Sequence, residues 1–341
     1  MRTAWRAEGS EGRHDGRQNP PQHGPRGAWA GELASATDAT RLTPRMSAGA
    51  GLRHLLRELT STMRVHERGL DLNLGPESLH DFRVAVRRAR CLLSQTRRVF
   101  RRRDVAFWDD GLHRLQQRSD ALRNVDTLLG WIAGRGPRDG DPQDLARLCA
   151  HLRRRRKAEL RSLLAHLRSP EHRAFMDGLQ DFLDRPAQAM ARGRRAGLPL
   201  AEVVGRRGAR MHRRLLKERR GLRAGSPADD LHAFRKRARK LRDLLQGTRD
   251  ALGAERVRPL VKALGRVTDE LGSAQDARMH LAVLDEAPRT PAIEAALRAK
   301  GRKAKHRQVR KVKALGRRRL RRLVATLATP VRIAHVRRAS A

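Results

Sequence analysis

The sequence predicts an all-α protein, and three observations support this fold class. Apolar residues recur at intervals of three and four from about residue 47 onward, and no segment alternates as a strand would. Leu, Ala and Arg, which all favour helices, are frequent throughout. Tyrosine is absent and only 3% of residues are aromatic, so the core must be mostly aliphatic. The 341 residues suffice for two ordinary domains or one large one.

Clusters of Gly and Pro divide the periodic region into segments of helix length. Clear breaks fall at Gly75-Pro76, between Gly134 and Pro142, and at Ser169-Pro170. Further breaks fall between Arg185 and Pro199 and between Gly225 and Pro227. We therefore expect helices over 47–68, 77–103, 105–130, 142–167, 171–184, 200–223, 228–252, 255–286 and 291–327.

Residues 1–46 are rich in Gly, Pro, Arg and Gln and show no helical period, which is typical of a disordered basic tail. Met46 is an alternative start of translation, which would make this tail a mistaken extension of the reading frame. No signal-peptide core and no apolar run of membrane-spanning length is found. The two cysteines, Cys91 and Cys149, are too few for a disulfide scaffold and fit a reducing cytosol.

The formal charge of +41 predicts a polyanionic partner, because a compact chain with this charge repels itself unless anions neutralise part of it. Nucleic acid, an anionic membrane surface and a phosphate polymer are the candidates. Net charge alone does not distinguish them.

One basic segment occurs twice. LHDFRVAVRRAR at 79–90 is followed by LHAFRKRARKLR at 231–242, an offset of 152 residues, and half of the sixteen aligned positions from 79–94 are identical. We therefore expect two helical bundles related by internal duplication and a pseudo-twofold axis, over 47–190 and 195–335.

Each copy has an apolar face with a basic stripe beside it. On a helix, Leu79, Phe82 and Val86 gather on one face, while the basic residues lie about 90° round the axis and so flank the core. The first stripe comprises His80, Arg83, Arg87, Arg90 and Arg97, and the second comprises His232, Arg235, Arg239, Arg242 and Arg249. Because acids are nearly absent from both segments, the offsetting charge must come from elsewhere in the fold or from a ligand. The alternative is an ordinary solvated arginine-rich face.

These residues resemble the CHAD family, named for a conserved histidine α-helical domain, whose hallmark is H-x-x-R-V-x-x-R-R-x-R. The first copy fits through His80, Arg83, Val84, Arg87, Arg88 and Arg90. The second fits through His232, Arg235, Arg239, Lys240 and Arg242, with Lys236 in place of the valine. The resemblance covers roughly 47–330. It implies two antiparallel four-helix bundles and a basic cavity between them that binds inorganic polyphosphate.

A second feature of the family, an L-G-x-x-R-D turn, is only half kept in each copy. Leu271-Gly272 with Gln275-Asp276 lacks the arginine, whereas Arg123-Asn124 lacks the aspartate. We expect this turn to pair with nearby arginines.

The two histidines are expected to donate to a phosphate oxygen or to orient an arginine, with a structural contact between helices as the alternative. No metal site is expected, because neither has a second ligand three or four residues away. The sequence indicates no cofactor. Lys303 and Arg307, in the basic segment 297–324, are further candidates for polyphosphate binding, and the outer surface is an equal alternative for that segment.

The sequence thus favours a polyphosphate-binding protein of the cytoplasm, associated with polyphosphate granules and without enzymatic activity. The alternative is a histone-like protein that binds nucleic acid nonspecifically, although few aromatic residues are present for base stacking. An enzyme is not expected, because the sequence has no phosphate-cradling loop and no carboxylate cluster for metal ions. No membrane partner is expected, and the oligomeric state is not specified by the sequence.

Overall fold

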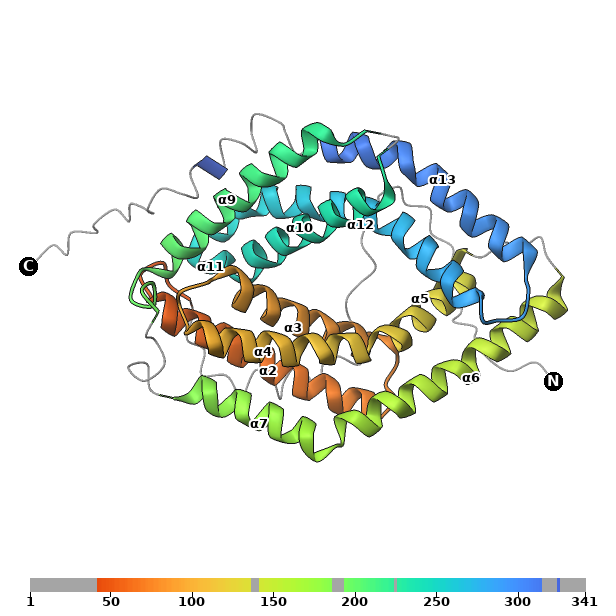
Figure 1. Ribbon diagram of the computed structural model, residues 1–341, viewed down its shortest axis with the longest axis horizontal. Coiled ribbons are helices and arrows are strands. Elements are labelled where there is room, and N and C mark those ends of the chain that lie inside the picture. The colour runs from red at the N-terminus through yellow and green to blue at the C-terminus, as the bar shows by residue number, and fades with distance from the viewer. Residues whose placement is uncertain (1–41, 136–140, 186–192, 224–225, 315–323, 326–341) are drawn as a thin grey trace, which may run out of the picture. The chain divides into compact units, whose positions relative to one another are not determined.

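The computed structural model describes residues 42–135, 141–185, 193–223, 226–314 and 324–325. Within these ranges every regular element is an α-helix, and the β pairing is limited to an isolated bridge between Ser47 and Pro199. The prediction of an all-α protein is therefore confirmed (Figure 1).

The described residues of the first half form six helices. Three of them begin at a residue whose side chain accepts a backbone N–H of the first turn, namely Ser47, Asp141 and Ser169. The helices are α2 (Ala48–Asp71), α3 (Pro76–Gln95), α4 (Arg102–Arg118), α5 (Asp120–Arg135), α6 (Pro142–Leu167) and α7 (Pro170–Asp184).

α3 ends at Gln95, so the predicted helix end at residue 103 is wrong. The hydroxyl of the buried Thr96 donates to the carbonyl oxygen of Leu92 at 2.5 Å, and Arg98 adopts a left-handed φ of 72°, which no helix accommodates. The next two residues are buried and turn the chain towards α4. The sequence RRVFRRR contains neither Gly nor Pro, so it gave no sign of this turn.

The helix predicted over 105–130 is divided into α4 and α5 at Ser119. This residue is fully buried, and its hydroxyl donates to the carbonyl oxygen of Gln116 at 2.8 Å. The guanidinium of Arg83 donates to the same carbonyl oxygen at 2.9 Å and to the Ser119 hydroxyl at 2.5 Å. A tertiary contact with α3 therefore accompanies the break, which local sequence did not indicate.

The second half forms α9 (Leu200–Gly221), α10 (Ala228–Gly247), α11 (Arg249–Leu252), α12 (Ala254–Leu284) and α13 (Pro291–Ala314). The helix predicted over 228–252 is divided at the buried Thr248, whose hydroxyl donates to the carbonyl oxygen of Leu244 at 2.8 Å. α12 runs through Leu271 without interruption, whereas the equivalent residue of the first half is Ser119.

The helices of the two halves follow the offset of the sequence repeat. α2, α3 and α4 begin at 48, 76 and 102, and α9, α10 and α12 begin 152 residues later, at 200, 228 and 254. Figure 1 shows α9–α13 on one side and α2–α7 on the other. The origin of the halves by duplication stays a prediction.

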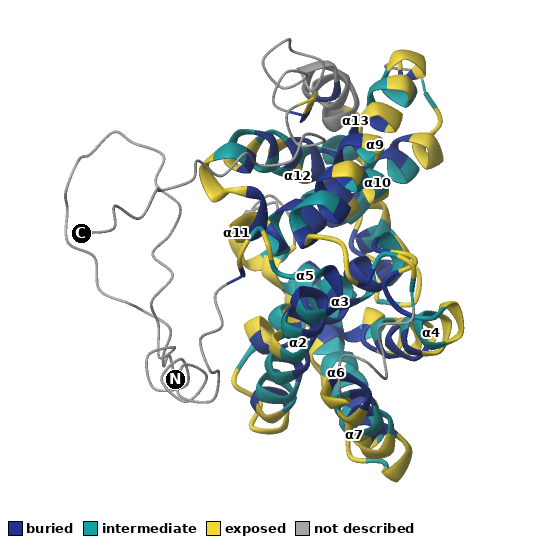
Figure 2. Cartoon of the chain, turned by 90° about the vertical axis from the view of Figure 1, so that its left-hand side faces the viewer, coloured by how far each residue is buried: buried dark blue, intermediate teal, exposed yellow. Residues whose placement is uncertain are grey.

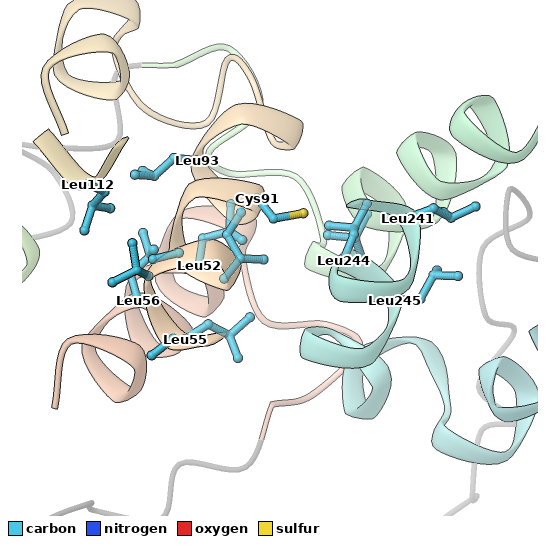
Figure 3. Packing of buried hydrophobic residues seen from close by; sticks show 14 of the residues in the cluster. Leu52, Leu55, Leu56, Cys91, Leu93, Leu112, Leu241, Leu244 and Leu245 are labelled. Atoms are coloured by element: carbon cyan, nitrogen blue, oxygen red, sulfur yellow. The ribbon is translucent and has the colours of Figure 1, made fainter. Parts of the chain in front are cut away.

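One hydrophobic cluster runs through both halves. Phe82 of α3 and its counterpart Phe234 of α10 are both fully buried in it, and burial of each stabilises the fold by about 1.5–3 kcal/mol. Figure 3 shows Cys91 of α3 lying between the leucines of α2 and Leu241 and Leu244 of α10. The two predicted bundles therefore share a core along α3 and α10.

A smaller cluster joins the halves at a second place. Leucines and valines of α5 and α6 pack there against apolar residues of α12 and α13. It comprises Val125, Leu128, Leu148, Leu152, Val283, Leu284, Ile293 and Leu297. The halves are thus held together both where α3 meets α10 and where α5 meets α12.

The last five residues of the tail predicted over 1–46 lie within the described part of the chain. Residues 1–41 lie outside the described ranges, but Leu42 is buried in the large cluster. The backbone N–H of Leu200 donates to the carbonyl oxygen of Met46 at 2.8 Å. These contacts fasten the segment before α2 to the beginning of α9.

Figure 2 shows that helices of both halves have one buried side and one exposed side. None of the helices in the described ranges is long and apolar enough to cross a membrane.

Candidate functional site

The two basic stripes meet where α3 packs against α10. The guanidinium Nε of Arg87 donates to the Asp243 carboxylate at 3.0 Å, and the Cys91 thiol donates to the Lys240 carbonyl oxygen at 3.2 Å. Arg87 also lies close enough to Arg235 and Arg239 to lower their pKa values. Segments about 150 residues apart in sequence thus bring their arginines together.

The first stripe is neutralised by carboxylates of the protein itself. Arg83 donates to Asp120 at 2.6 Å, and its side chain is only 16% exposed. Arg90 donates to Asp109 at 3.0 Å and to the side-chain carbonyl oxygen of Gln116 at 3.1 Å. Together with the pair between Arg87 and Asp243, these contacts satisfy the stripe of α3.

The second stripe makes the same neutral contacts at equivalent positions. Arg235 donates to the Thr268 carbonyl oxygen at 3.3 Å, as Arg83 does to that of Gln116. Arg242 donates to the Thr268 hydroxyl at 2.9 Å, and the carboxylate nearest to its Nη1 belongs to the exposed Asp269 at 3.6 Å.

The aspartates that pair with the stripe of α3 have no acidic counterparts at the equivalent positions of the other half. At the offset of 152 residues, Gly272 stands where Asp120 would be, and Val261 stands where Asp109 would be. The counterpart of the pair between Arg87 and Asp243 is Arg239 with the uncharged thiol of Cys91.

Arg239 is the least compensated group of the second stripe. It has no hydrogen bond and no ion pair to the described residues. Desolvation, reinforced by Arg235 and Arg87, lowers the pKa of its guanidinium to about 10, although Asp243 acts in the opposite direction. A half-buried cation that no carboxylate hydrogen-bonds is unfavourable for folding and favourable for binding an anion.

The two incomplete copies of the family turn, one with Arg123 and the other with Asp276, lie near each other across the halves. Asp276 of α12 interacts electrostatically with Arg123 of α5, so the aspartate kept in one copy lies near the arginine kept in the other. Burial raises the pKa of Asp276, and Arg235, Lys300 and Arg123 oppose this shift. We name Arg87, Arg123, Arg235 and Arg239 the inner arginine cluster. Asp276 is an acid that lies among them.

Two basic residues near Asp276 were not singled out as site residues from the sequence. Arg123 was noted only as part of the half-kept turn, and that turn was the available signal for it. Lys300 lies within the basic segment of α13, where nothing distinguished it from its neighbours.

The two histidines differ in exposure. His80 is exposed, and its pKa is lowered by desolvation and then by Arg123, while Asp81 raises it. His232 is half-buried, its Nδ1 is buried without a partner, and its pKa is lowered by desolvation and by Lys236 and Arg235. Both shifts favour the neutral imidazole. The described residues contain no group of three or more His, Cys, Asp or Glu placed to hold a metal ion.

The other predicted site residues are placed differently. Arg88 is 100° further round α3 than Arg87, but it interacts electrostatically with Arg87, Arg242 and Asp243, and its Nε is buried without a hydrogen-bond partner. Lys240 is its exposed counterpart on α10. Arg97 and Arg249 are not on the helical stripes, because α3 ends at Gln95 and α10 at Gly247. Lys303 and Arg307 belong to α13, but their side chains lie outside the described part of the chain.

Comparisons with known proteins identify the family and the fold of the chain. The sequence matches the family described as CHAD domain over residues 54–285 and, in a second match, over residues 220–340. The chain is similar to the crystal structure of the CHAD domain from the plant Ricinus communis, with 21% identity, a TM-score of 0.61, and coverage of 85% of this chain and 94% of that one. It is also similar to PptA from Streptomyces chartreusis, with 17% identity, a TM-score of 0.53, and coverage of 82% and 100%. No curated protein matches the sequence.

Proposed function

This chain belongs to the CHAD family, and from that premise we propose that it binds inorganic polyphosphate in a basic cavity between its two helical halves. The polymer contacts the inner arginine cluster, and the other arginines and histidines of the two stripes that lie on α3 and α10 surround that contact. The protein acts by binding and does not transform the polymer.

The observation that carries this proposal is the uncompensated Arg239. Its guanidinium is half-buried beside two further arginines and has no carboxylate partner in the described residues. A bound phosphate group would supply the missing charge and accept from the guanidinium in the bidentate geometry that arginine favours. The sequence has thus kept a cation where the fold alone would be more stable without one.

The duplicated stripes favour a phosphate polymer over a single phosphate as the ligand. Linear polyphosphate presents charged oxygens at short regular intervals and has neither bases nor sugars, so its recognition needs only guanidinium and ammonium groups. Arginines from α3, α5 and α10 meet in one place, and their contacts add along one chain through multivalency. Arginine stems beside the core lose less entropy on binding than free surface side chains do.

The proposal includes a location. A protein that engages a long polymer at several points should concentrate where a cell stores that polymer, which in a bacterium means polyphosphate granules in the cytoplasm. Charge alone would instead direct a protein of net charge +41 to DNA.

Competition at fixed salt separates these two readings. Full-length protein is loaded with a fluorescent duplex DNA, and long-chain polyphosphate or unlabelled duplex is added at equal phosphate concentration. We expect polyphosphate to displace the probe at a concentration at least about tenfold lower, and we expect Arg239→Ala to remove this advantage. Equal displacement by both polymers, unchanged in the variant, would support nonspecific nucleic-acid binding.

Catalysis is tested on the same samples. Polyphosphate incubated with the protein, with and without Mg²⁺ and nucleotide, should keep its chain-length distribution on a gel. Shortening or lengthening that disappears in Arg239→Ala would contradict a purely binding role.

A further inference from the structure

A basic cavity, separate from the one proposed between the halves, lies at the C-terminal end of α3, away from the inner arginine cluster. It has a volume of about 820 Å³ and lies among the turn between α3 and α4, the first turn of α4 and the turn residues Gly193 and Arg194. Five arginines line it, namely Arg97, Arg98, Arg101, Arg102 and Arg194. Arg87 lies eight residues before the end of α3, which is roughly 12 Å along the helix axis.

The cationic groups of this cavity have no partners within the described part of the chain. None of the five guanidinium groups makes a hydrogen bond or ion pair with the residues that the structure describes. The acid in the lining, Asp109, is already paired with Arg90 at 3.0 Å. The charge that would balance these arginines must therefore come from a ligand or from solvent ions.

The first turn of α4 adds backbone donors to the same cavity. Arg101 is the N-cap residue, and no side chain caps the helix there. The N–H groups at the beginning of a helix have no partners within it and carry partial positive charge. This combination of free N–H groups and guanidinium groups is well suited to phosphate oxygens.

The backbone around the cavity is held in a conformation that costs free energy. Arg98 has a φ of 72°, which is uncommon for a residue with a side chain. The N–H of Arg195 donates to the Arg98 carbonyl oxygen at 3.0 Å, and a Cβ on Gly193 would lie 2.1 Å from that oxygen. A glycine is thus required for the close approach. A strained turn that holds an unpaired arginine in a cavity points to a functional role.

A smaller cavity of about 270 Å³ adjoins the first, since Arg97 and Arg98 line both. Its other basic residues are Arg195, Arg207 and Arg210. Arg207 donates to the side chain of Gln95 at 2.6 Å, while its Nε is buried without a partner. One elongated anionic ligand could therefore contact arginines of both cavities.

We propose that these cavities form a second site, which binds an oligophosphate, meaning a chain of two or three phosphoryl groups. The volume is in the range of small-molecule sites, and several unpaired arginines match several phosphoryl groups better than one. The chemistry is shared by free pyrophosphate or tripolyphosphate and by the phosphate chain of a nucleotide. The site has no residue in common with the inner arginine cluster, so it does not depend on the proposed function.

Titration calorimetry on the full chain without Mg²⁺ tests the site, with pyrophosphate, tripolyphosphate, ATP and inorganic phosphate as probes. We expect tripolyphosphate to bind most tightly among the inorganic probes. Arg101→Gln combined with Arg194→Gln should weaken it by about tenfold or more, the effect expected from losing charge-assisted contacts. Equal affinity for ATP and tripolyphosphate indicates recognition of the phosphate chain alone, whereas tighter binding of ATP indicates a nucleotide.

Three further variants make the result specific. Arg98→Gly should lose affinity while raising the thermal midpoint, because glycine tolerates the positive φ. Arg103→Gln is the matched control, since this exposed arginine lies in the first turn of α4 but outside the lining. Arg239→Ala should weaken long-chain polyphosphate and leave tripolyphosphate unchanged. Unchanged affinity in the double variant, an equal loss in Arg103→Gln, or a loss in Arg239→Ala would each overturn the second site.

Discussion

α3 and α10 carry the same pattern of histidine and arginines, but they differ in how the charges are compensated. Aspartates of the protein pair with three arginines of α3, and their counterparts on α10 lack such close partners in the described part of the chain. Arg83, Arg87 and Arg90 of α3 each donate to an aspartate within 3.0 Å. The counterparts Arg235, Arg239 and Arg242 of α10 have no carboxylate within that distance among the described residues. The neutral contacts to residues 116 and 268 are retained on both sides.

The difference shows that identical motifs need not have identical roles. On α3, Arg83, Arg87 and Arg90 connect that helix to α5, α10 and α4, and their charges are satisfied before any ligand arrives. On α10 the same side chains are positioned but remain short of negative charge. We therefore expect α3 to contribute mainly to stability and α10 mainly to binding.

Loss of Arg239 should have the largest effect on binding. Arg239→Ala is expected to weaken long-chain polyphosphate binding by about 10- to 100-fold, because a well-placed charge-assisted contact contributes about 1.5–3 kcal/mol. The unliganded variant should be at least as stable as the original, since a buried charge without a partner is removed. Calorimetry and thermal unfolding measure the two quantities. A large loss of stability would show that Arg239 is structural.

Arg83→Ala should give the opposite result. Its three donated hydrogen bonds connect α3 to the break between α4 and α5, and removing them leaves a buried hydroxyl and carbonyl without this donor. We expect a loss of about 1–3 kcal/mol in the free energy of unfolding, with polyphosphate affinity changed by less than about threefold. Urea denaturation measures the first. If affinity falls as much as in Arg239→Ala, the two stripes are equivalent after all.

Restoring a missing carboxylate should make α10 resemble α3. A Cβ at residue 272 would lie 2.9 Å from the Arg235 guanidinium, a flexible group that can move aside. Gly272→Asp should therefore pair with Arg235 as Asp120 does with Arg83, and we expect polyphosphate affinity to fall by about five- to tenfold. Gly272→Asn is the control for size and should reduce affinity much less. Equal losses in both would assign the effect to crowding.

The smallest expected effect is a pH dependence of binding. The pKa of His232 is lowered by its burial and the cations around it, so a bound polyanion should raise that pKa and binding should take up a proton. Affinity should then rise by about two- to threefold as the pH falls from about 8 to about 6. His232→Asn should remove more of this dependence than His80→Asn, because Asp81 and Glu77 already moderate the field at His80. A slope unchanged in both variants would exclude the histidines from the site.

The sequence by itself determined the helices, the offset of the repeat and the existence of two basic stripes. Each of these depends on local spacing: apolar residues every three or four positions bury one face, and the residues 90° away are fixed by the same geometry. The offset of 152 recurs in the beginnings of three pairs of helices because each copy has its own turn and cap signals.

Only the tertiary structure decided which arginines are already neutralised. The partners of Arg83, Arg87 and Arg90 lie 37, 156 and 19 residues away in sequence, and nothing in the helical period indicates that α10 lacks equivalents. The turn at Arg98, and with it the second cavity, depends on a hydrogen bond from Arg195 that closes only in the folded chain. Charge compensation acts through space, so a sequence pattern predicts where cations stand but not which of them still lack an anion.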